Sequence, residues 1–160
     1  MLLIHVHIYG ALLKLTLCLI GLTLPALVFA EDKCAQAIEG NDQMQFNLSS
    51  MEFPASCKAV KITLKHTGKL PINAMGHNWV LVKTADVNAV GMAGMSAGID
   101  NDHVPQNDPR VLAATKLIGG GEETSLEFDI SKLDPKEKYT YICTFPGHFS
   151  VMKGEFKIAA

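Results

Sequence analysis

Apolar and polar residues alternate with a period of two in several short segments of this chain, and this pattern constrains its fold more than any other feature. Val60, Ile62 and Leu64 alternate with lysine and threonine, as in a strand with one buried and one exposed face. Similar short runs cover residues 79–82, 126–130, 139–143 and 152–158. Turn residues separate these runs, and short strands at such spacing predict a β-sandwich with Greek-key connections.

The segment 84–99 does not alternate between apolar and polar residues, because it consists mainly of alanine, methionine and glycine. We expect a short irregular helix here, with Thr84 as its N-cap and Asp86 in its first turn. Gly91 and Gly94 weaken this prediction, since each costs a helix about 1 kcal/mol relative to alanine. We interpret the segment as an excursion off the sandwich.

The first thirty residues differ in composition from the rest of the chain. The run 15–30 carries no charge, follows Lys14 and ends in small residues, which is the pattern of a cleaved signal peptide. The run is shorter than the roughly 20 residues of a transmembrane anchor, and a leucine before Cys18 fits lipoprotein processing poorly. We therefore expect residues 1–30 to be removed and residues 31–160 to form a single domain.

The charge balance is nearly even. The chain has 14 lysines and arginines against 16 aspartates and glutamates, and removing residues 1–30 removes only Lys14 from these, which leaves a formal net charge of −3. Charges of both signs are spread along the chain without long runs. We expect neither nucleic-acid binding nor stable membrane association after signal cleavage.

The cysteine count becomes odd once Cys18 is removed. Cys34 and Cys57 lie near the start of the expected domain, and neither has a histidine or methionine at ligand spacing. We expect these two to form a disulfide, as an exported protein permits. Cys143 does have such neighbours, and coordination as a thiolate would protect it from oxidation and mispairing.

The segment CTFPGHFSVM near the C-terminus places Cys143, His148 and Met152 on one short loop. Pro146-Gly147 supplies the turn that folds such a loop back on itself, and His77 offers a second imidazole from far upstream. Imidazole and thiolate donors favour copper or zinc over calcium or magnesium. The methionine favours copper, because a thioether suits Cu(I) better than zinc, although zinc could fill the same cage.

The motifs MGHNWVL and CTFPGHFSVM resemble the azurin family of cupredoxins, and NDQMQFN and RVLAATKLIG are also similar to it. The four residues between Cys143 and His148 form a longer gap than in plastocyanin-like relatives. Cys34 and Cys57 match the disulfide positions of the family. The resemblance implies an all-β, cupredoxin-like Greek-key sandwich of about eight strands with one short helical insertion and one copper ion near one end.

The resemblance also implies a set of ligands. His77, Cys143 and His148 would be the strong ligands of the copper ion. Met152 would be a weak axial ligand, and the backbone carbonyl of Gly76 a second weak one on the opposite side. Such a cage changes little between Cu(II) and Cu(I), which makes one-electron exchange fast.

Residues beside the ligands have implied roles as well. Asn78 and Thr144 would tie the two ligand-bearing segments together, and backbone N–H groups near Asn78 and Phe145 would hydrogen-bond the sulfur of Cys143. From the residues alone, Asn78 could equally bond its own local backbone at a strand end. Both interpretations stay open at this point.

An apolar surface around His148 would be the exit for the electron. The residues at the family's patch positions could equally be ordinary apolar side chains scattered over the surface. A patch without strong charge would suit brief docking with another redox protein. The resemblance assigns to this electron-transfer patch Met44, Leu70, Met75, Met95, Phe145, Pro146 and His148.

The remaining histidines of the expected domain have less specific surroundings. His66 matches a family position that couples protonation to redox state, although Thr67 follows it where the family often has proline. Redox-linked titration and an ordinary edge-strand histidine both stay open for His66. We expect His103 to lie in a solvated loop and not to bind the metal. Ala114 stands where some relatives carry a surface histidine, so no role is carried over there.

Together these features predict an exported one-electron carrier rather than an enzyme. The resemblance implies that it works in the periplasm and passes electrons between redox proteins such as c-type cytochromes and copper enzymes such as nitrite reductase. A copper-delivery protein is the alternative, but such sites are methionine-rich or carry paired cysteines, and C-x-x-C is absent. A copper enzyme would need further histidines, and only His66 and His103 are left for a second site.

Overall fold

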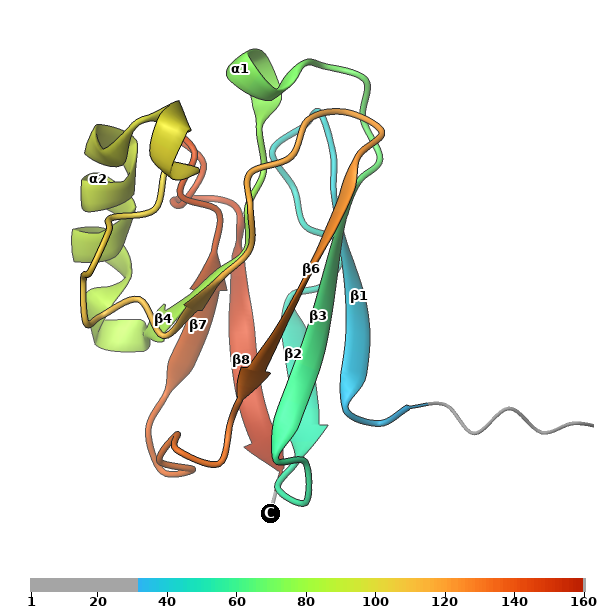
Figure 1. The fold of residues 1–160 in the computed structure, drawn as a ribbon, viewed down its shortest axis with the longest axis vertical. Helices are drawn as coiled ribbons and strands as arrows, with labels where there is room; N and C mark the ends of the chain where they lie inside the picture. The colour runs from blue at the N-terminus through green and yellow to red at the C-terminus, as the bar shows by residue number, and fades with distance from the viewer. Residues whose placement is uncertain (1–31, 160) are drawn as a thin grey trace, which may run out of the picture. The chain divides into compact units, whose positions relative to one another are not determined.

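The computed structural model describes residues 32–159, which form two β-sheets (Figure 1). The predicted signal peptide, residues 1–30, lies outside the described residues. The strands are β1 (Ala35–Gly40), β2 (Ser50–Pro54), β3 (Ala59–His66), β4 (Val80–Lys83), β5 (Ala113–Ala114), β6 (Glu123–Asp129), β7 (Tyr139–Ile142) and β8 (Lys153–Ala159). One sheet has the order β1-β3-β6 and the other β2-β8-β7-β4-β5. The predicted all-β sandwich of about eight strands is confirmed.

Alternation along β3 shows why the sheets pack face to face. Val60, Ile62 and Leu64 are fully buried, whereas Lys61 and Lys65 are exposed and Thr63 is half-buried. These side chains share one core with residues of the other sheet such as Trp79 and Tyr141. The inner faces of the two sheets therefore form the main hydrophobic core.

Helix α2 (Val87–Ala97) explains why buried and exposed residues do not alternate along β4 and β7. Val90 of the helix packs against Val80, Val82 and Ile142, which lie on the side of the second sheet away from the main core (Figure 1). The central strands of this sheet are thus covered on both sides and read as continuous apolar runs. The predicted helical insertion is confirmed, and it covers the sheet.

The start of the helical segment differs from the prediction. Residues Thr84–Asp86 form a 3-10 turn, and α2 begins at Val87 without a side-chain cap. Thr84 is not the N-cap, because its hydroxyl hydrogen-bonds that of Thr140 on β7 at 2.9 Å. Two shorter elements complete the described region, the single-turn helix α1 (Ile72–Met75) and a 3-10 turn at Ile99–Asn101.

The predicted disulfide joins Cys34 and Cys57. These residues precede β1 and β3, so the disulfide lies at the end of the sandwich opposite to Gly40 and His66, where the same strands end. Cys143 is the free cysteine of the described region, and it is buried. Within residues 32–159, no helix has both the length and the apolar character needed to span a membrane.

Candidate metal centre

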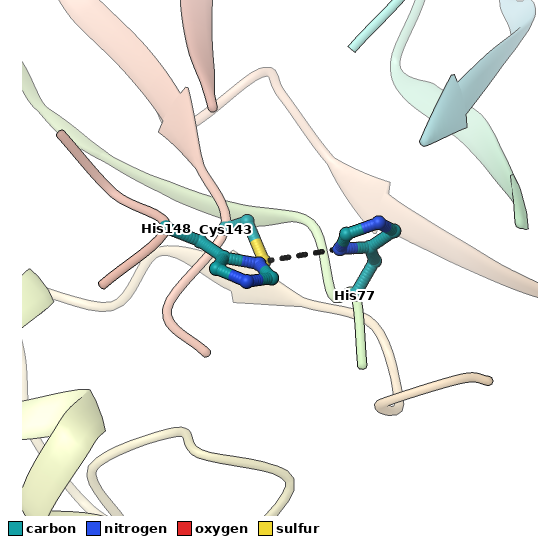
Figure 2. Close-up of side chains that lie close together, drawn as sticks. All are labelled: His77, Cys143 and His148. Carbon is teal, nitrogen blue, oxygen red and sulfur yellow. Dashed lines mark hydrogen bonds between the residues drawn. The ribbon is translucent and has the colours of Figure 1, made fainter. Parts of the chain in front are cut away.

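Three side chains from distant parts of the sequence meet at one end of the sandwich (Figure 2). Sγ of Cys143 lies 3.5 Å from Nδ1 of His148 and 3.9 Å from Nδ1 of His77. The three candidate ligand atoms all lie within 4.8 Å of one another, and all three residues are buried. One metal ion could therefore contact all of them.

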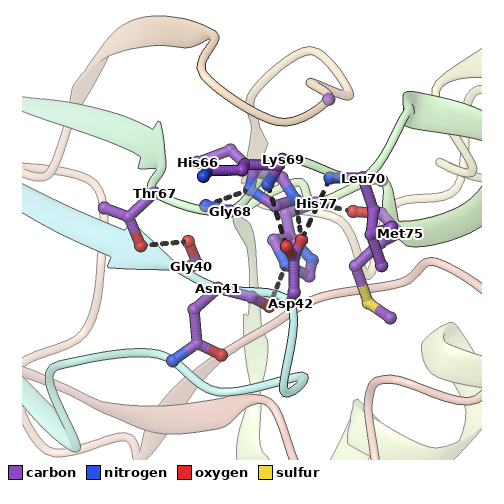
Figure 3. A network of polar contacts seen from close by, with 12 residues as sticks. Gly40, Asn41, Asp42, His66, Thr67, Gly68, Lys69, Leu70, Met75 and His77 are labelled. Atoms are coloured by element: carbon purple, nitrogen blue, oxygen red, sulfur yellow. Dashed lines mark hydrogen bonds and ion pairs between the residues drawn. The ribbon is translucent and has the colours of Figure 1, made fainter.

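His77 is held by its backbone and by its ring. Its backbone exchanges two hydrogen bonds with Ile118, at 3.0 and 2.9 Å. Nε2 of the ring donates to the carbonyl of Asn41 at 2.9 Å, which leaves Nδ1 free to face Cys143 (Figure 3). A Cβ on Gly40 would lie 2.6 Å from the His77 ring, so only glycine lets β1 approach this closely. The hydrogen bond to Asn41 thus sets the tautomer that a metal ligand requires.

The loop that carries the other candidate ligands closes on itself. Cys143 directly follows β7, and its N–H donates to the carbonyl of Met152 at 3.0 Å. The carbonyl of His148 accepts the N–H of Met152 at 2.8 Å. Gly147 has a φ of +83°, a left-handed conformation that glycine adopts freely. The turn expected at Pro146-Gly147 is present in the structure.

Two further predicted ligands lie beside these three. Met152 is fully buried and packs in a small apolar cluster with Cys143, Leu117 and Phe145. The carbonyl oxygen of Gly76 lies 3.9 Å from Sγ of Cys143. Both groups are therefore adjacent to the three candidate ligands, and their coordination of a metal stays a prediction.

Burial controls the protonation of the candidate ligands. It raises the pKa of the Cys143 thiol to about 12, although the backbone N–H groups of Asn78 and Phe145 oppose this rise. Burial, and next the positive charge of nearby histidines, lower the pKa of His148 to about 4. Burial also lowers the pKa of His77. At neutral pH the imidazoles are therefore free to bind, whereas the thiol must lose a proton to a metal.

The donor chemistry fits copper. Two imidazole nitrogens and one thiolate form a soft, nitrogen- and sulfur-rich set, which disfavours the hard cations calcium and magnesium. A buried thioether next to this set favours copper over zinc.

Asn78 joins the two segments that carry the candidate ligands. Its side-chain carbonyl accepts the N–H of Thr144 at 2.8 Å, and its amide donates to the Thr144 hydroxyl at 2.8 Å and to the Asp102 carbonyl at 2.7 Å. The Thr144 hydroxyl in turn donates to the carbonyl of His103 at 2.7 Å. The interpretation of Asn78 as bonding its own local backbone is therefore wrong, since its partners are distant in the sequence.

His66 and His103 differ from each other in position but are both buried. Nε2 of His66 donates to the Met75 carbonyl at 2.8 Å, Nδ1 accepts the Gly68 N–H at 3.0 Å, and the ring stacks on His77 at 4.3 Å (Figure 3). His66 is thus not an ordinary edge-strand histidine, because it is buried at the end of β3, the central strand of its sheet.

His103 lies in a loop, as predicted, but the prediction that it is solvated is wrong, because the residue is buried. Its ring packs edge-on against Phe145 at 5.1 Å, and Nδ1 lies 3.3 Å from the Gly94 carbonyl. The local pattern around Pro105 indicated a loop but held no signal for this packing. Among the described residues, His103 is not part of the group of candidate ligands.

The predicted electron-transfer patch is uneven in exposure. Leu70 is 41% exposed and Met44 38% exposed. Asp42 joins their loops, because its carboxylate accepts the N–H groups of Lys69 and Leu70 (Figure 3). Pro146 is exposed, and Met75 and Met95 are half-buried.

Two members of the patch lie deeper than predicted. Phe145 is buried, and His148 exposes only 2% of its surface, so the ring is not a broadly exposed edge. Val151 was not among the predicted patch residues, although it is apolar, 61% exposed and part of the same loop. Its place between two predicted ligands on the same loop was the signal that could have identified it.

Comparison with known proteins gives a consistent result. The model of the copper-binding proteins of the plastocyanin/azurin family matches residues 32–159. The chain is 52% identical over 126 residues to azurin from Bordetella pertussis, covering 79% of this chain and 84% of the relative. It is 49% identical over 136 residues to azurin from Pseudomonas aeruginosa, covering 85% of this chain and 90% of the relative.

A solved structure agrees with these relatives. The chain matches an azurin, Az-iso2, from the obligate methylotroph Methylomonas sp. strain J with a TM-score of 0.78 and 44% identity. The match covers 81% of this chain and 100% of the other. With its eight-stranded sandwich and its buried group of two histidines and one cysteine, the chain belongs to the plastocyanin/azurin family of copper-binding proteins.

Proposed function

We propose that this protein is a one-electron carrier that holds one copper ion through His77, Cys143 and His148. The observation that supports this most directly is the convergence of these three side chains in a buried position. Proteins of the azurin type are electron-transfer cupredoxins, so the protein is not an enzyme. Copper bound there would supply one-electron exchange between Cu(II) and Cu(I).

Met152 and the Gly76 carbonyl would complete the proposed site as two weak ligands. Met152 is buried against Cys143, and the Gly76 carbonyl approaches the same sulfur from a different segment of the chain. The Met152 backbone is held by hydrogen bonds to Cys143 and His148, and the segment of Gly76 is held by the two backbone hydrogen bonds between His77 and Ile118. Ligands held in this way move little when the charge at the site changes, which favours fast electron exchange.

Buried ligands also argue against copper delivery as the function. A delivery protein must hand the ion to a partner, whereas His77 and Cys143 are fully buried here and His148 nearly so. The hydrogen bonds that fix each segment would have to break before such a transfer. An electron, by contrast, can leave without any change in coordination.

We propose that redox partners dock near the loop of His148. Leu70, Met44 and Val151 expose apolar side chains, and Val151 lies on the loop of His148 itself. Small apolar contact areas suit brief encounters, because they bury little surface and dissociate quickly. The partners would be c-type cytochromes and copper enzymes such as nitrite reductase.

We propose the periplasm as the location, reached after removal of residues 1–30. The disulfide between Cys34 and Cys57 supports an oxidising compartment. The curated relatives matched by the chain are bacterial azurins. Mass spectrometry of the periplasmic fraction would test this, with a mature N-terminus at Glu31 as the expected result.

A spectroscopic experiment tests the proposed function. The purified protein is titrated with Cu(II), and an intense visible thiolate charge-transfer band should reach its maximum at one copper per chain. Ascorbate should bleach the band, and an oxidised c-type cytochrome should restore it with one electron transferred per copper. The control variant Cys143→Ser should fold but show neither the band nor the electron transfer.

Two results would contradict the proposal. One is the absence of the charge-transfer band in the copper-loaded wild-type protein. The other is rapid transfer of copper to a chelating partner without any redox change, which would favour copper delivery instead.

A further inference from the structure

The loop of candidate ligands touches helix α2 at two glycines. A Cβ on Gly91 would overlap the aromatic ring of Phe149. A Cβ on Gly94 would lie 2.6 Å from Cβ of Thr144 and 2.6 Å from the carbonyl oxygen of His103. Both glycines are buried, and their spacing of three places them on the same side of the helix. The loop therefore occupies the space that two helix side chains would otherwise fill.

These two contacts lie directly beside the candidate ligands. Thr144 follows Cys143 in the chain, and Phe149 follows His148. The contact at Gly94 thus involves the residue after Cys143, and the contact at Gly91 the residue after His148. The part of the loop that carries the turn lies between them.

The Thr144 contact is supported by other bonds, but the Phe149 contact has no such support. Thr144 is already fixed by its hydrogen bonds to Asn78 and His103. The Phe149 side chain instead enters the apolar cluster beneath α2, formed by Val80, Val82, Val90 and Ile142. The position of the Phe149 ring therefore depends on apolar packing between α2 and the strands beneath it, and not on hydrogen bonds.

Glycine inside a helix needs a packing reason, because it costs helix stability relative to alanine. Gly91 lies in the middle of α2, and its φ is not positive. The backbone therefore does not require glycine at this position. The ring of Phe149 supplies the reason, since any larger residue would displace it.

We propose that the packing of the Phe149 ring into the gap left by the absent side chain of Gly91, called the notch below, positions the His148 end of the ligand loop. Helix α2 is then a structural part of the metal centre. The His148 carbonyl accepts the N–H groups of Val151 and Met152, so Phe149 lies inside the turn that sets both ligands. An anchored Phe149 ring therefore fixes the orientation of this turn before a metal binds. The proposal rests on the proposed role of His148 and Met152 as ligands.

Variants at both positions test the proposal. Gly91→Ala and Phe149→Ala should each weaken Zn(II) and Cu(II) binding by about 10-fold, the usual effect of losing a group that orients a ligand. In the double variant, Gly91→Ala should add little to the effect of Phe149→Ala, because removal of the ring leaves room for the new Cβ. Phe149→Leu should restore part of the affinity by refilling the notch.

A second measurement uses the metal-free protein. Amide hydrogen exchange at Met152 and Val151 should become faster in Gly91→Ala and Phe149→Ala, since their N–H groups close the turn at His148. The control Ser96→Ala changes an exposed position of the same helix and should leave both readouts unchanged. The control Ile62→Val removes a methylene from the main core and should lower stability without affecting the loop.

The possible results separate the proposal from the proposed function. Unchanged metal affinity and unchanged exchange in both single variants, or additive effects in the double variant, would overturn the positioning role. If Gly91→Ala fails to fold, Phe149→Ala and Phe149→Leu decide the question alone. Faster exchange at the loop in a protein without the charge-transfer band would support the positioning role while refuting the electron-carrier function.

Discussion

Asn78 and Thr144 are joined by two hydrogen bonds of 2.8 Å, one in each direction, and both residues are fully buried. The pair connects the residue after His77 with the residue after Cys143. The distance between the imidazole and the thiol is therefore set by a polar link that is independent of any metal.

Replacing Asn78 with leucine should weaken both the fold and the metal centre. The change leaves the buried N–H of Thr144 without its acceptor, which should cost about 1–3 kcal/mol in the free energy of unfolding. Copper affinity should fall by about 10- to 100-fold. Chemical unfolding of the metal-free protein and competition with a chelator measure the two effects. An unchanged affinity would show that the link does not orient the ligands.

Metal binding at neutral pH should release one proton per ion. Burial raises the pKa of the Cys143 thiol to about 12, while the lowered pKa values of His77 and His148 keep both imidazoles neutral. The affinity for Zn(II) should therefore rise about tenfold per pH unit above neutrality. Calorimetry in two buffers of different ionisation enthalpy counts the protons. Binding without proton release would mean that the thiol is already ionised.

The stability of the metal-free protein should fall as the solution becomes acidic. Burial lowers the pKa of His148 from 6.5 to about 4, so the unfolded chain takes up this proton more readily than the folded one. This contribution is fully present above pH 6.5 and is lost as the pH falls towards 4. Thermal unfolding across this range measures it. The variant His148→Asn should show a smaller loss, and an equal loss in both proteins would contradict the assignment.

Removing the disulfide should destabilise the fold without changing the metal centre. The bond closes a loop with a sequence separation of 23, so Cys34→Ala with Cys57→Ala should lower the free energy of unfolding by about 3 kcal/mol. The pair lies at the opposite end of β1 and β3 from His66. The charge-transfer spectrum of the copper-loaded variant should therefore match that of the wild type. A shifted spectrum would show that the two ends of the sandwich are coupled.

A charge in the apolar patch should affect only the encounter with partners. Leu70 is exposed, so Leu70→Glu should leave the spectrum unchanged but slow electron exchange with a c-type cytochrome in stopped-flow experiments. Lys136→Gln changes the net charge by the same amount and lies just before β7, at the far end of the sheet. Equal slowing by both variants would assign the effect to net charge and not to docking at the patch.

The ligand loop shows how far local sequence can predict a site. Cys143, His148 and Met152 are near in the chain, and Pro146-Gly147 encodes the turn between them, so their meeting follows from local geometry. The strands were predictable for a similar reason. A buried face on a strand leaves a period of two in the sequence wherever the opposite face is exposed, as along β3.

Features that depend on contacts between distant residues left no such signal. Asn78 could not be separated from a residue bonding its own backbone, because its partners lie 24 and 66 residues away. The burial of His103 within its loop could not be predicted either, because its contacts are with Phe145 and Gly94 on other segments.

Helix α2 shows both what local sequence patterns can predict and what only tertiary contacts decide. The sequence by itself determined that the segment 84–99 is not a strand, that the rest is a β-sandwich and that a thiolate, two imidazoles and a thioether are available. Only the tertiary structure decided that α2 covers β4 and β7 and that Gly91 receives Phe149. The reason is physical. A strand period or a turn is encoded by neighbouring residues, whereas the reason for a glycine such as Gly91 lies in the distant residue, Phe149, that fills the space beside it.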